Sequence, residues 1–267
     1  MSPSAGNHDP SGRIELTFDG KVALIMVRHP PHNFLTEPLL RSLADTLAGL
    51  GGSTRAAVIG SEGRSFCAGA NFRSGDAPDP ASGSTFEAST RAFYAQAARI
   101  FTAPVPLVAA VHGPAVGAGL GLALACDLRV LGQNAWLAAN FVRLGIHPGF
   151  AISLTLPRLV GPGRASDMLL TGRRVEAAEA ASMGLAERLV SSGTEIEVAI
   201  RLAHEIAHGA PLAVASTRAT LRQGLAADAA EALSHELAEQ ARLAGTADAI
   251  EGVSAMLEGR EPTFDGI

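Results

Sequence analysis

The sequence predicts an α/β fold followed by a helical region, and three observations support this class. First, short apolar runs bounded by glycine and proline alternate with amphipathic segments over residues 13–193. Second, the apolar run at 106–111 leads through a Gly-rich turn into small, apolar residues, a pattern typical of a buried strand entering a closely packed helix. Third, only helices are expected over 194–267. We therefore predict a disordered lead-in at 1–12, a core at 13–193 and a C-terminal helical region at 194–267.

The elements of the predicted core have identifiable start and stop signals. Asp19 and Gly20 separate two apolar runs, which predicts a tight hairpin joining strands at 13–18 and 21–27. Thr36 is a favoured N-cap residue before a leucine stripe, so a helix is expected to run to Leu50. The later elements are strands at 55–59, 106–111, 128–131, 136–138 and 186–190, loops at 61–71 and 140–149, a mobile segment at 73–84, and helices at 85–101, 115–126, 152–159, 164–171 and 176–183.

Composition excludes several classes of function. The formal net charge of −5 argues against a nucleic-acid-binding surface, which would normally be basic. Lys21 is the only lysine and lies in a predicted strand, so neither a Schiff-base lysine nor a phosphate-loop lysine is expected. Cys67 and Cys126 are too few for a disulfide framework, and the N-terminus lacks an apolar signal region. We therefore predict a cytoplasmic protein, and we expect no metal site.

The segment 105–126 carries the central functional hypothesis and three competing ones. A strand that enters a helix through a Gly-rich turn leaves backbone N–H groups free to hold a phosphate, a carboxylate or a developing oxyanion. The segment also lacks charged residues over a membrane-spanning length, although Pro106, Pro114 and the glycines oppose a span and no membrane association is expected. A dinucleotide loop is disfavoured because Leu122 stands where the third glycine of that motif belongs. The third alternative is a core helix without chemistry.

Six motifs are distributed over nearly the whole chain. They read SFCAGAN at 65–71, PLVAAVHGPAVGAGLGLALACDLRV at 106–130, LGIHPG at 144–149, LPRLVG at 156–161, LLTGRRVEAAEAASMGLAERLV at 169–190 and DAIEGVSAMLEGREPTF at 248–264. In this order and spacing they resemble the enoyl-CoA hydratase/isomerase (crotonase) superfamily. The resemblance implies a crotonase-like spiral of ββα units with a C-terminal helical trimerisation region. It also implies a homo-trimer or hexamer that binds an acyl-CoA, with coenzyme A as part of the substrate and no other cofactor required.

The resemblance assigns the shared chemistry of the family to two backbone N–H groups, which hold the thioester oxygen as negative charge builds on it. By position in the motifs these groups belong to Ala70 and to Ala118, the latter where the family commonly has glycine. The implied coenzyme A contacts are Ala68, Ala70, Asn71, Phe72 and Arg73, and the implied substrate pocket includes Gly117, Gly121 and Phe141.

The sequence departs from the hydratases of the family at the two positions where those enzymes carry catalytic glutamates. These positions hold Gly121 and Phe141, neither of which can transfer a proton, so classical hydration is not expected. The aspartate of the chlorobenzoyl-CoA dehalogenases is absent from 145–149 as well. A variant with glutamate at both positions is expected to gain hydratase activity if the scaffold is otherwise intact.

Other side chains could carry the proton chemistry instead. His147 lies in a loop that the family folds over the acyl end of the site, and we name it as a candidate catalytic residue. The competing interpretation is a loop histidine bonded to a backbone carbonyl, and His112 is expected to be such a turn residue. Further candidates are Asp76, Asp79 and Glu87, which should mostly be solvated, and Cys67, a nucleophile without a visible base.

These expectations lead to two hypotheses of function. The first is an acyl-CoA thioester-transforming enzyme of fatty acid metabolism, a lyase or isomerase, that stabilises a thioester enolate through Ala70 and Ala118. The second is a non-catalytic acyl-CoA-binding or oligomer-partner subunit.

Overall fold

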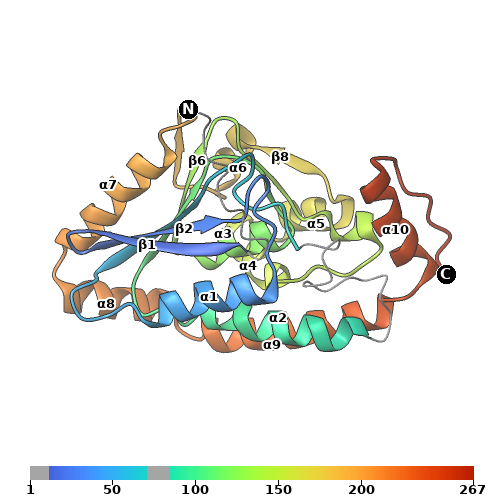
Figure 1. Ribbon diagram of the computed structural model, residues 1–267, viewed down its shortest axis with the longest axis horizontal. Helices are drawn as coiled ribbons and strands as arrows, with labels where there is room; N and C mark the ends of the chain where they lie inside the picture. The colour runs from blue at the N-terminus through green and yellow to red at the C-terminus, as the bar shows by residue number, and fades with distance from the viewer. Residues whose placement is uncertain (1–11, 71–84) are drawn as a thin grey trace, which may run out of the picture.

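The fold is organised around a six-stranded sheet. In the computed structural model, which describes residues 12–70 and 85–267, its strands are β1 (Arg13–Asp19), β2 (Val22–Arg28), β3 (Ala56–Ser61), β4 (Leu107–Val111), β6 (Leu128–Gly132) and β9 (Arg188–Val190). They lie side by side in this order (Figure 1). β1 pairs antiparallel with β2, and every later pair is parallel. Parallel strands joined through helices confirm the predicted α/β class.

Both faces of the four inner strands, β2, β3, β4 and β6, are largely buried, because their side chains alternate between two apolar layers. On one face Val58 and Val108 pack with α7 (Glu195–His208), which contributes Ala199 and Ala203. On the other face the strands join the main core, which includes residues of α1 (Glu37–Ala48), α2 (Phe86–Ile100) and α9 (Leu225–Leu243). Figure 1 shows these three helices side by side along one edge of the molecule. The domain boundary at residue 194 stays a prediction. α7 follows this boundary in the chain but packs on the sheet formed by residues before it.

The local signals near the N-terminus are confirmed. Asp19 pairs with Val22 across the hairpin, and Gly20 between them has a φ of 59°, which glycine adopts without strain. The Thr36 side chain caps α1 by accepting a hydrogen bond from the Leu39 N–H at 3.3 Å.

A second, three-stranded sheet corrects the prediction for 115–126. It consists of β5 (Ala115–Val116), β7 (Trp136–Ala138) and β8 (Arg174–Glu176), so the helix is confined to α3 (Ala118–Ala125). Ala115 and Val116 are extended because they pair with β7. Glu176, which was assigned to a helix, ends β8 because it pairs with Trp136. No helix within 12–70 or 85–267 is long and apolar enough to cross a membrane.

The remaining elements surround the two sheets. They are the 3-10 helix η2 (Asn140–Leu144) within the predicted loop, and the helices α4 (Ile152–Val160), α5 (Pro162–Thr171), α6 (Ala177–Met183), α8 (Pro211–Leu221) and α10 (Ala247–Glu258). In Figure 1, α8 and α10 lie at opposite ends of the molecule. The predicted lead-in at 1–12, apart from Gly12, and the predicted mobile segment at 73–84 lie outside the described residues.

A substitution at Gly119, in the first turn of α3, can test how closely this helix packs on the loop that follows β3. A Cβ atom at this position would lie 2.0 Å from the carbonyl oxygen of Cys67, which is backbone and cannot rotate away. Gly119→Ala is therefore expected to lower the free energy of unfolding by about 1–3 kcal/mol, measured by urea denaturation. The control is Gly163→Ala in α5, where nothing lies within 4 Å of the added Cβ. That substitution should raise stability by roughly 0.5–1 kcal/mol, and equal effects of the two would contradict this packing.

Candidate active site

Two loops from separate parts of the chain are fixed side by side by backbone hydrogen bonds. The Cys67 N–H donates to the Pro114 carbonyl oxygen at 3.1 Å, and the Val116 N–H donates to the Cys67 carbonyl oxygen at 3.0 Å. This pairing joins the loop after β3 to β5 and to the start of α3. Gly119 permits the close approach, because a side chain there would overlap Cys67.

Ala70 and Ala118, the two predicted oxyanion-hole residues, lie on the wall of one cavity. Ala118 is the first residue of α3, so its N–H has no acceptor within the helix, and the preceding Gly117 has no side chain that could cap it. No hydrogen bond joins the N–H of Ala70 or of Ala118 to another residue of the described ranges. Two unused backbone donors beside one cavity are an arrangement that can hold a developing oxyanion.

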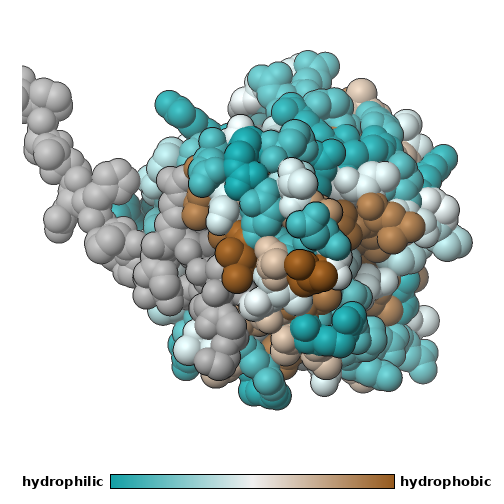
Figure 2. Space-filling view, turned by 90° about the vertical axis from the view of Figure 1, so that its right-hand side faces the viewer, coloured by the Kyte–Doolittle hydropathy of each residue, from teal (hydrophilic) through white to brown (hydrophobic). Residues whose placement is uncertain are grey.

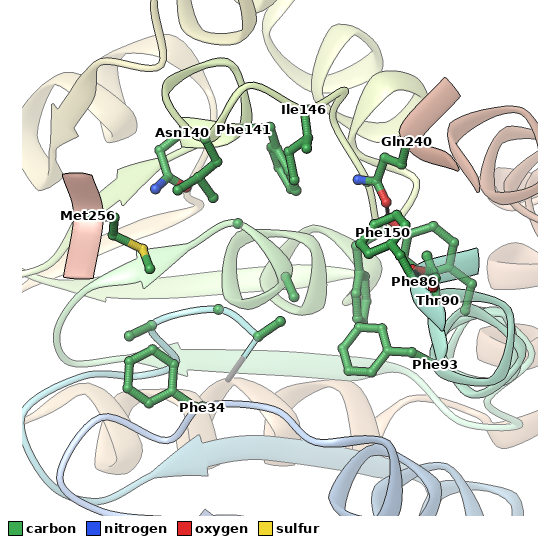
Figure 3. A pocket seen from close by; sticks show the side chains of 18 of the residues that line it. Phe34, Phe86, Thr90, Phe93, Asn140, Phe141, Ile146, Phe150, Gln240 and Met256 are labelled. Atoms are coloured by element: carbon green, nitrogen blue, oxygen red, sulfur yellow. Dashed lines mark hydrogen bonds between the residues drawn. The ribbon is translucent and has the colours of Figure 1, made fainter. Parts of the chain in front are cut away.

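The cavity has a volume of about 320 Å³ and one exposed and one buried end. Met256 lies at one side of the view in Figure 3 and is 40% exposed. Phe86, Phe93 and Phe150 lie at the opposite side and are at most 2% exposed. Figure 2 shows the face at the α10 end, where apolar side chains gather among hydrophilic ones. A ligand is therefore expected to enter beside α10 and to place its far end among the phenylalanines.

Gly117 and Phe141, two of the predicted pocket residues, line this cavity, but Gly121 does not. A Cβ atom at Gly121 would lie 2.6 Å from the Cβ and Cδ1 atoms of Phe150, so the Phe150 side chain occupies the space above this glycine. Glutamate at 121 cannot enter without displacing that ring. The predicted gain of hydratase activity required an otherwise intact scaffold, and the Phe150 ring fills the first of the two positions, so the gain stays a prediction that also requires this ring to move.

His147 is not among the residues that line the cavity. Its Nδ1 atom lies 2.8 Å from the Pro148 carbonyl oxygen, and its ring meets His235 edge-on at 5.7 Å. This geometry agrees with the competing interpretation, in which His147 is a loop histidine bonded to main chain. The side chain does not reach the cavity, so nothing in the structure supports a catalytic role for it. His112 likewise bonds main chain, with its Nε2 atom 3.2 Å from the Gly63 carbonyl oxygen, as predicted.

The other candidates are dispersed. Ala68 lines the cavity, whereas Asn71, Phe72, Arg73, Asp76 and Asp79 lie outside the described residues. Glu87 is exposed and forms an ion pair with Arg91 on the surface of α2. Burial raises the pKa of the Cys67 thiol to about 12, so the thiol stays protonated and is a poor nucleophile.

Several polar residues that line the cavity were not found from the sequence. They are His32, Thr90, Tyr94, Asn140 and Gln240. Tyr94 and Gln240 come from α2 and α9, and the Tyr94 hydroxyl donates to Gln240 Oε1 at 2.9 Å. In the sequence, each of Tyr94 and Gln240 is only a polar side chain on an otherwise apolar helix face. This pattern does not identify a hydrogen-bond partner in a distant helix.

Glu236 of α9 fixes the turn that carries Phe150. Its carboxylate accepts hydrogen bonds from the Ala151 N–H at 2.7 Å, the Ser153 N–H at 3.1 Å and the Ser153 hydroxyl at 2.6 Å. Phe150 and Ala151 both have left-handed φ angles, 61° and 55°, which are unusual for residues with a side chain. These hydrogen bonds hold the turn in that conformation and so place the Phe150 ring over Gly121.

The arrangement of an α/β core with two free backbone amides on one apolar cavity is that of the crotonase class, and comparisons with known proteins agree. Residues 17–266 match the Enoyl-CoA hydratase/isomerase family. The 2,3-dehydroadipyl-CoA hydratase of Escherichia coli (strain K12) is 35% identical over 249 residues, covering 92% of this chain and 96% of that protein. The probable enoyl-CoA hydratase 2, mitochondrial, of Arabidopsis thaliana is 32% identical over 259 residues, covering 96% and 82%.

Solved structures extend this similarity to the fold. The crystal structure of an enoyl-CoA hydratase/isomerase from Pseudoalteromonas atlantica T6c matches with a TM-score of 0.82 at 28% identity, covering 94% of this chain and 99% of that one. The chain therefore belongs to the enoyl-CoA hydratase/isomerase family, and the predicted crotonase-like fold is confirmed.

The buried carboxyl of Glu236 predicts a pH-dependent stability. Burial raises its pKa from 4.5 to about 7, although three hydrogen bonds oppose the shift. Because the folded state holds this proton more tightly, the stability it contributes is fully present below about pH 4.5 and is lost as the pH rises through about 7. Between about pH 5 and about pH 8, the unfolding free energy of the wild type should fall by on the order of 3 kcal/mol more than that of Glu236→Gln. Urea denaturation with the exposed Glu231→Gln as control measures this, and parallel pH profiles of wild type and Glu236→Gln would refute it.

Proposed function

We propose that this protein binds an acyl-CoA and holds the thioester oxygen between the N–H groups of Ala70 and Ala118, so that an enolate of the acyl group is stabilised. The observation that carries the proposal is that two backbone donors on the wall of one apolar cavity have no acceptor within residues 12–70 and 85–267. Such donors act strongly in a site that excludes water, and each is typically worth ~100–1000-fold in rate. Coenzyme A enters as part of the substrate, and its contacts are proposed along Ala68, Asn71, Phe72 and Arg73.

The proposed chemistry differs from the standard hydration of the family. His32 and Tyr94 are the only ionisable side chains among the described residues that line the cavity. Burial and the nearby Glu236 raise the pKa of Tyr94 well above its usual value, so it stays protonated. Each missing general acid or base is worth roughly 100- to 10,000-fold in rate. We therefore propose that thioester activation is kept, while the route through two glutamates is lost.

A non-catalytic acyl-CoA-binding or oligomer-partner subunit is the second candidate. This candidate is favoured because no carboxylate is among the described residues that line the cavity. The two candidates differ in whether any acyl-CoA undergoes turnover.

We also propose the homo-trimer or hexamer that the resemblance implies. α8 has no buried residue, and its Leu212 and Leu221 are 85% and 77% exposed. We propose α8 as the subunit contact because covering these two exposed leucines on association would remove apolar surface from water. Cytoplasmic location stays a prediction, in keeping with two free, buried cysteines.

Ala118→Pro tests the oxyanion role, because it removes one N–H donor at the first helical position, where proline is well tolerated. The readout is exchange of the acyl Cα hydrogens of hexanoyl-CoA with D₂O, since the thioester releases a Cα proton to the solvent when the enolate forms, and the enolate then takes up a deuteron from D₂O. The exchange rate should fall by ~100–1000-fold, with an unchanged thermal unfolding profile.

Ala118→Ser, which keeps the N–H, is the matched control and should retain most of the exchange. A wild-type exchange rate in Ala118→Pro would contradict the role of this amide. Binding of hexanoyl-CoA without exchange or turnover in the wild type would favour the non-catalytic candidate.

If α8 forms the subunit contact, negative charges introduced on this helix should dissociate the oligomer. Leu212→Asp combined with Leu221→Asp should convert the assembly into smaller species in sedimentation-velocity experiments, because two carboxylates would lose water on association. Phe18→Asp, at a 59% exposed position of β1, is the control and should leave the assembly intact. Unchanged sedimentation of the double variant would show that α8 is not the interface.

A further inference from the structure

The buried end of the cavity has a defined chemistry, and it bears on the substrate of the function proposed above. Three phenylalanine rings meet there, and the rings of Phe93 and Phe150 pack edge-to-face with centroids 6.0 Å apart. Figure 3 shows Phe86, Phe93 and Phe150 together on the side away from Met256. Such a surface favours apolar groups through burial and ring contacts.

The polar side chains at this end are already engaged with the protein. The Thr90 hydroxyl donates to the Phe86 carbonyl oxygen at 2.7 Å. The Tyr94 hydroxyl donates to Gln240 Oε1 at 2.9 Å, and Gln240 Nε2 donates to the His147 carbonyl oxygen at 2.8 Å. A polar group brought to this end by a ligand would have to displace one of these bonds or remain unpaired, and both outcomes weaken binding.

No cation offsets a charge at this end within the described part of the chain. His32 lines the cavity, but its ring packs edge-on against Phe34, which Figure 3 places on the side away from Phe93 and Phe150. A buried carboxyl group lies beside this end, because Glu236 accepts a hydrogen bond from the N–H of Ala151, the residue after Phe150. A terminal carboxylate on an acyl chain would therefore meet low polarity and a second carboxyl group.

Phe150 sets the depth of this end. Its ring fills the space above Gly121, and its left-handed turn is held by the Glu236 hydrogen bonds. The ring also packs edge-to-face on Phe93, with centroids 6.0 Å apart. The hydrogen bonds fix the backbone of the turn, and a movement of the ring away from this position would break its contact with Phe93.

We propose that the site selects acyl-CoA thioesters with a compact, wholly apolar acyl group, that it rejects acyl groups ending in a carboxylate, and that Phe150 is the residue that limits acyl length. The proposal rests on the acyl-CoA binding proposed above and adds the class of acyl group to it.

The test is calorimetric titration of the full-length protein with saturated acyl-CoAs, which undergo no hydration. Hexanoyl-CoA and adipoyl-CoA have the same chain length and differ only in the terminal carboxylate. Adipoyl-CoA is expected to bind at least ~10-fold more weakly. Phe150→Ala should raise the affinity for decanoyl-CoA relative to that for hexanoyl-CoA by ~10-fold or more, because the cavity then extends towards Gly121.

Phe18→Ala, a matched loss of an exposed phenyl ring in β1, should leave both ratios as in the wild type. Phe150→Leu gives a second, milder opening of the cavity if Phe150→Ala fails to fold. Equal affinity for adipoyl-CoA and hexanoyl-CoA, or an unchanged length preference in the Phe150 variants, would overturn this inference while acyl-CoA binding itself stands. Absence of binding by any acyl-CoA to the wild type would overturn the proposed function and this inference together.

Discussion

The backbone pairing between Cys67 and the segment 114–116 is the constraint on which the rest of the site depends. It connects the loop after β3 to the start of α3, two segments that the sequence separates by about fifty residues. Because main-chain atoms make the contact, it specifies few side chains, and it requires glycine at 119, where a Cβ atom would overlap Cys67. The N–H groups of Ala70 and Ala118 reach one cavity as a consequence of this pairing. Function in this fold is therefore positioned by backbone geometry before any side chain takes part.

The buried end of the cavity is formed by side chains, and no carboxylate is among the described residues that line the cavity. Gly121 and Phe150 are complementary, since the Phe150 ring fills the space left by the absent side chain of Gly121. Phe141 also faces the cavity as a hydrocarbon surface. Glu236, the buried carboxyl group beside this end, is occupied by three hydrogen bonds that hold the turn before α4. The protein thus uses a buried carboxyl group to position a wall of the cavity, and Glu236 itself does not line that cavity.

Backbone features of the site could be predicted from the sequence, and its distant side-chain contacts could not. Short-range signals, such as the Asp19–Gly20 turn and the Thr36 cap, depend on neighbours in the chain and were confirmed. The helix after the Gly-rich turn could also be predicted, but it starts at Ala118 and not at 115, because β5 before it pairs with β7 over a long range. The overlap of Phe150 with Gly121 and the Tyr94–Gln240 bond join residues from different helices and loops. Neither contact follows from local composition, and His147 was selected over them because its residue type suggested proton transfer.

The most direct measurement is isotope-edited infrared spectroscopy of hexanoyl-CoA labelled with ¹³C at its thioester carbonyl. Hydrogen bonds from two amides weaken the C=O bond, so the carbonyl band of the bound ligand should lie at lower frequency than in water, and the Ala118→Pro variant should reduce that shift. A bound ligand whose carbonyl band stays at its aqueous frequency would contradict the account, because its thioester oxygen would then gain nothing from the paired amides.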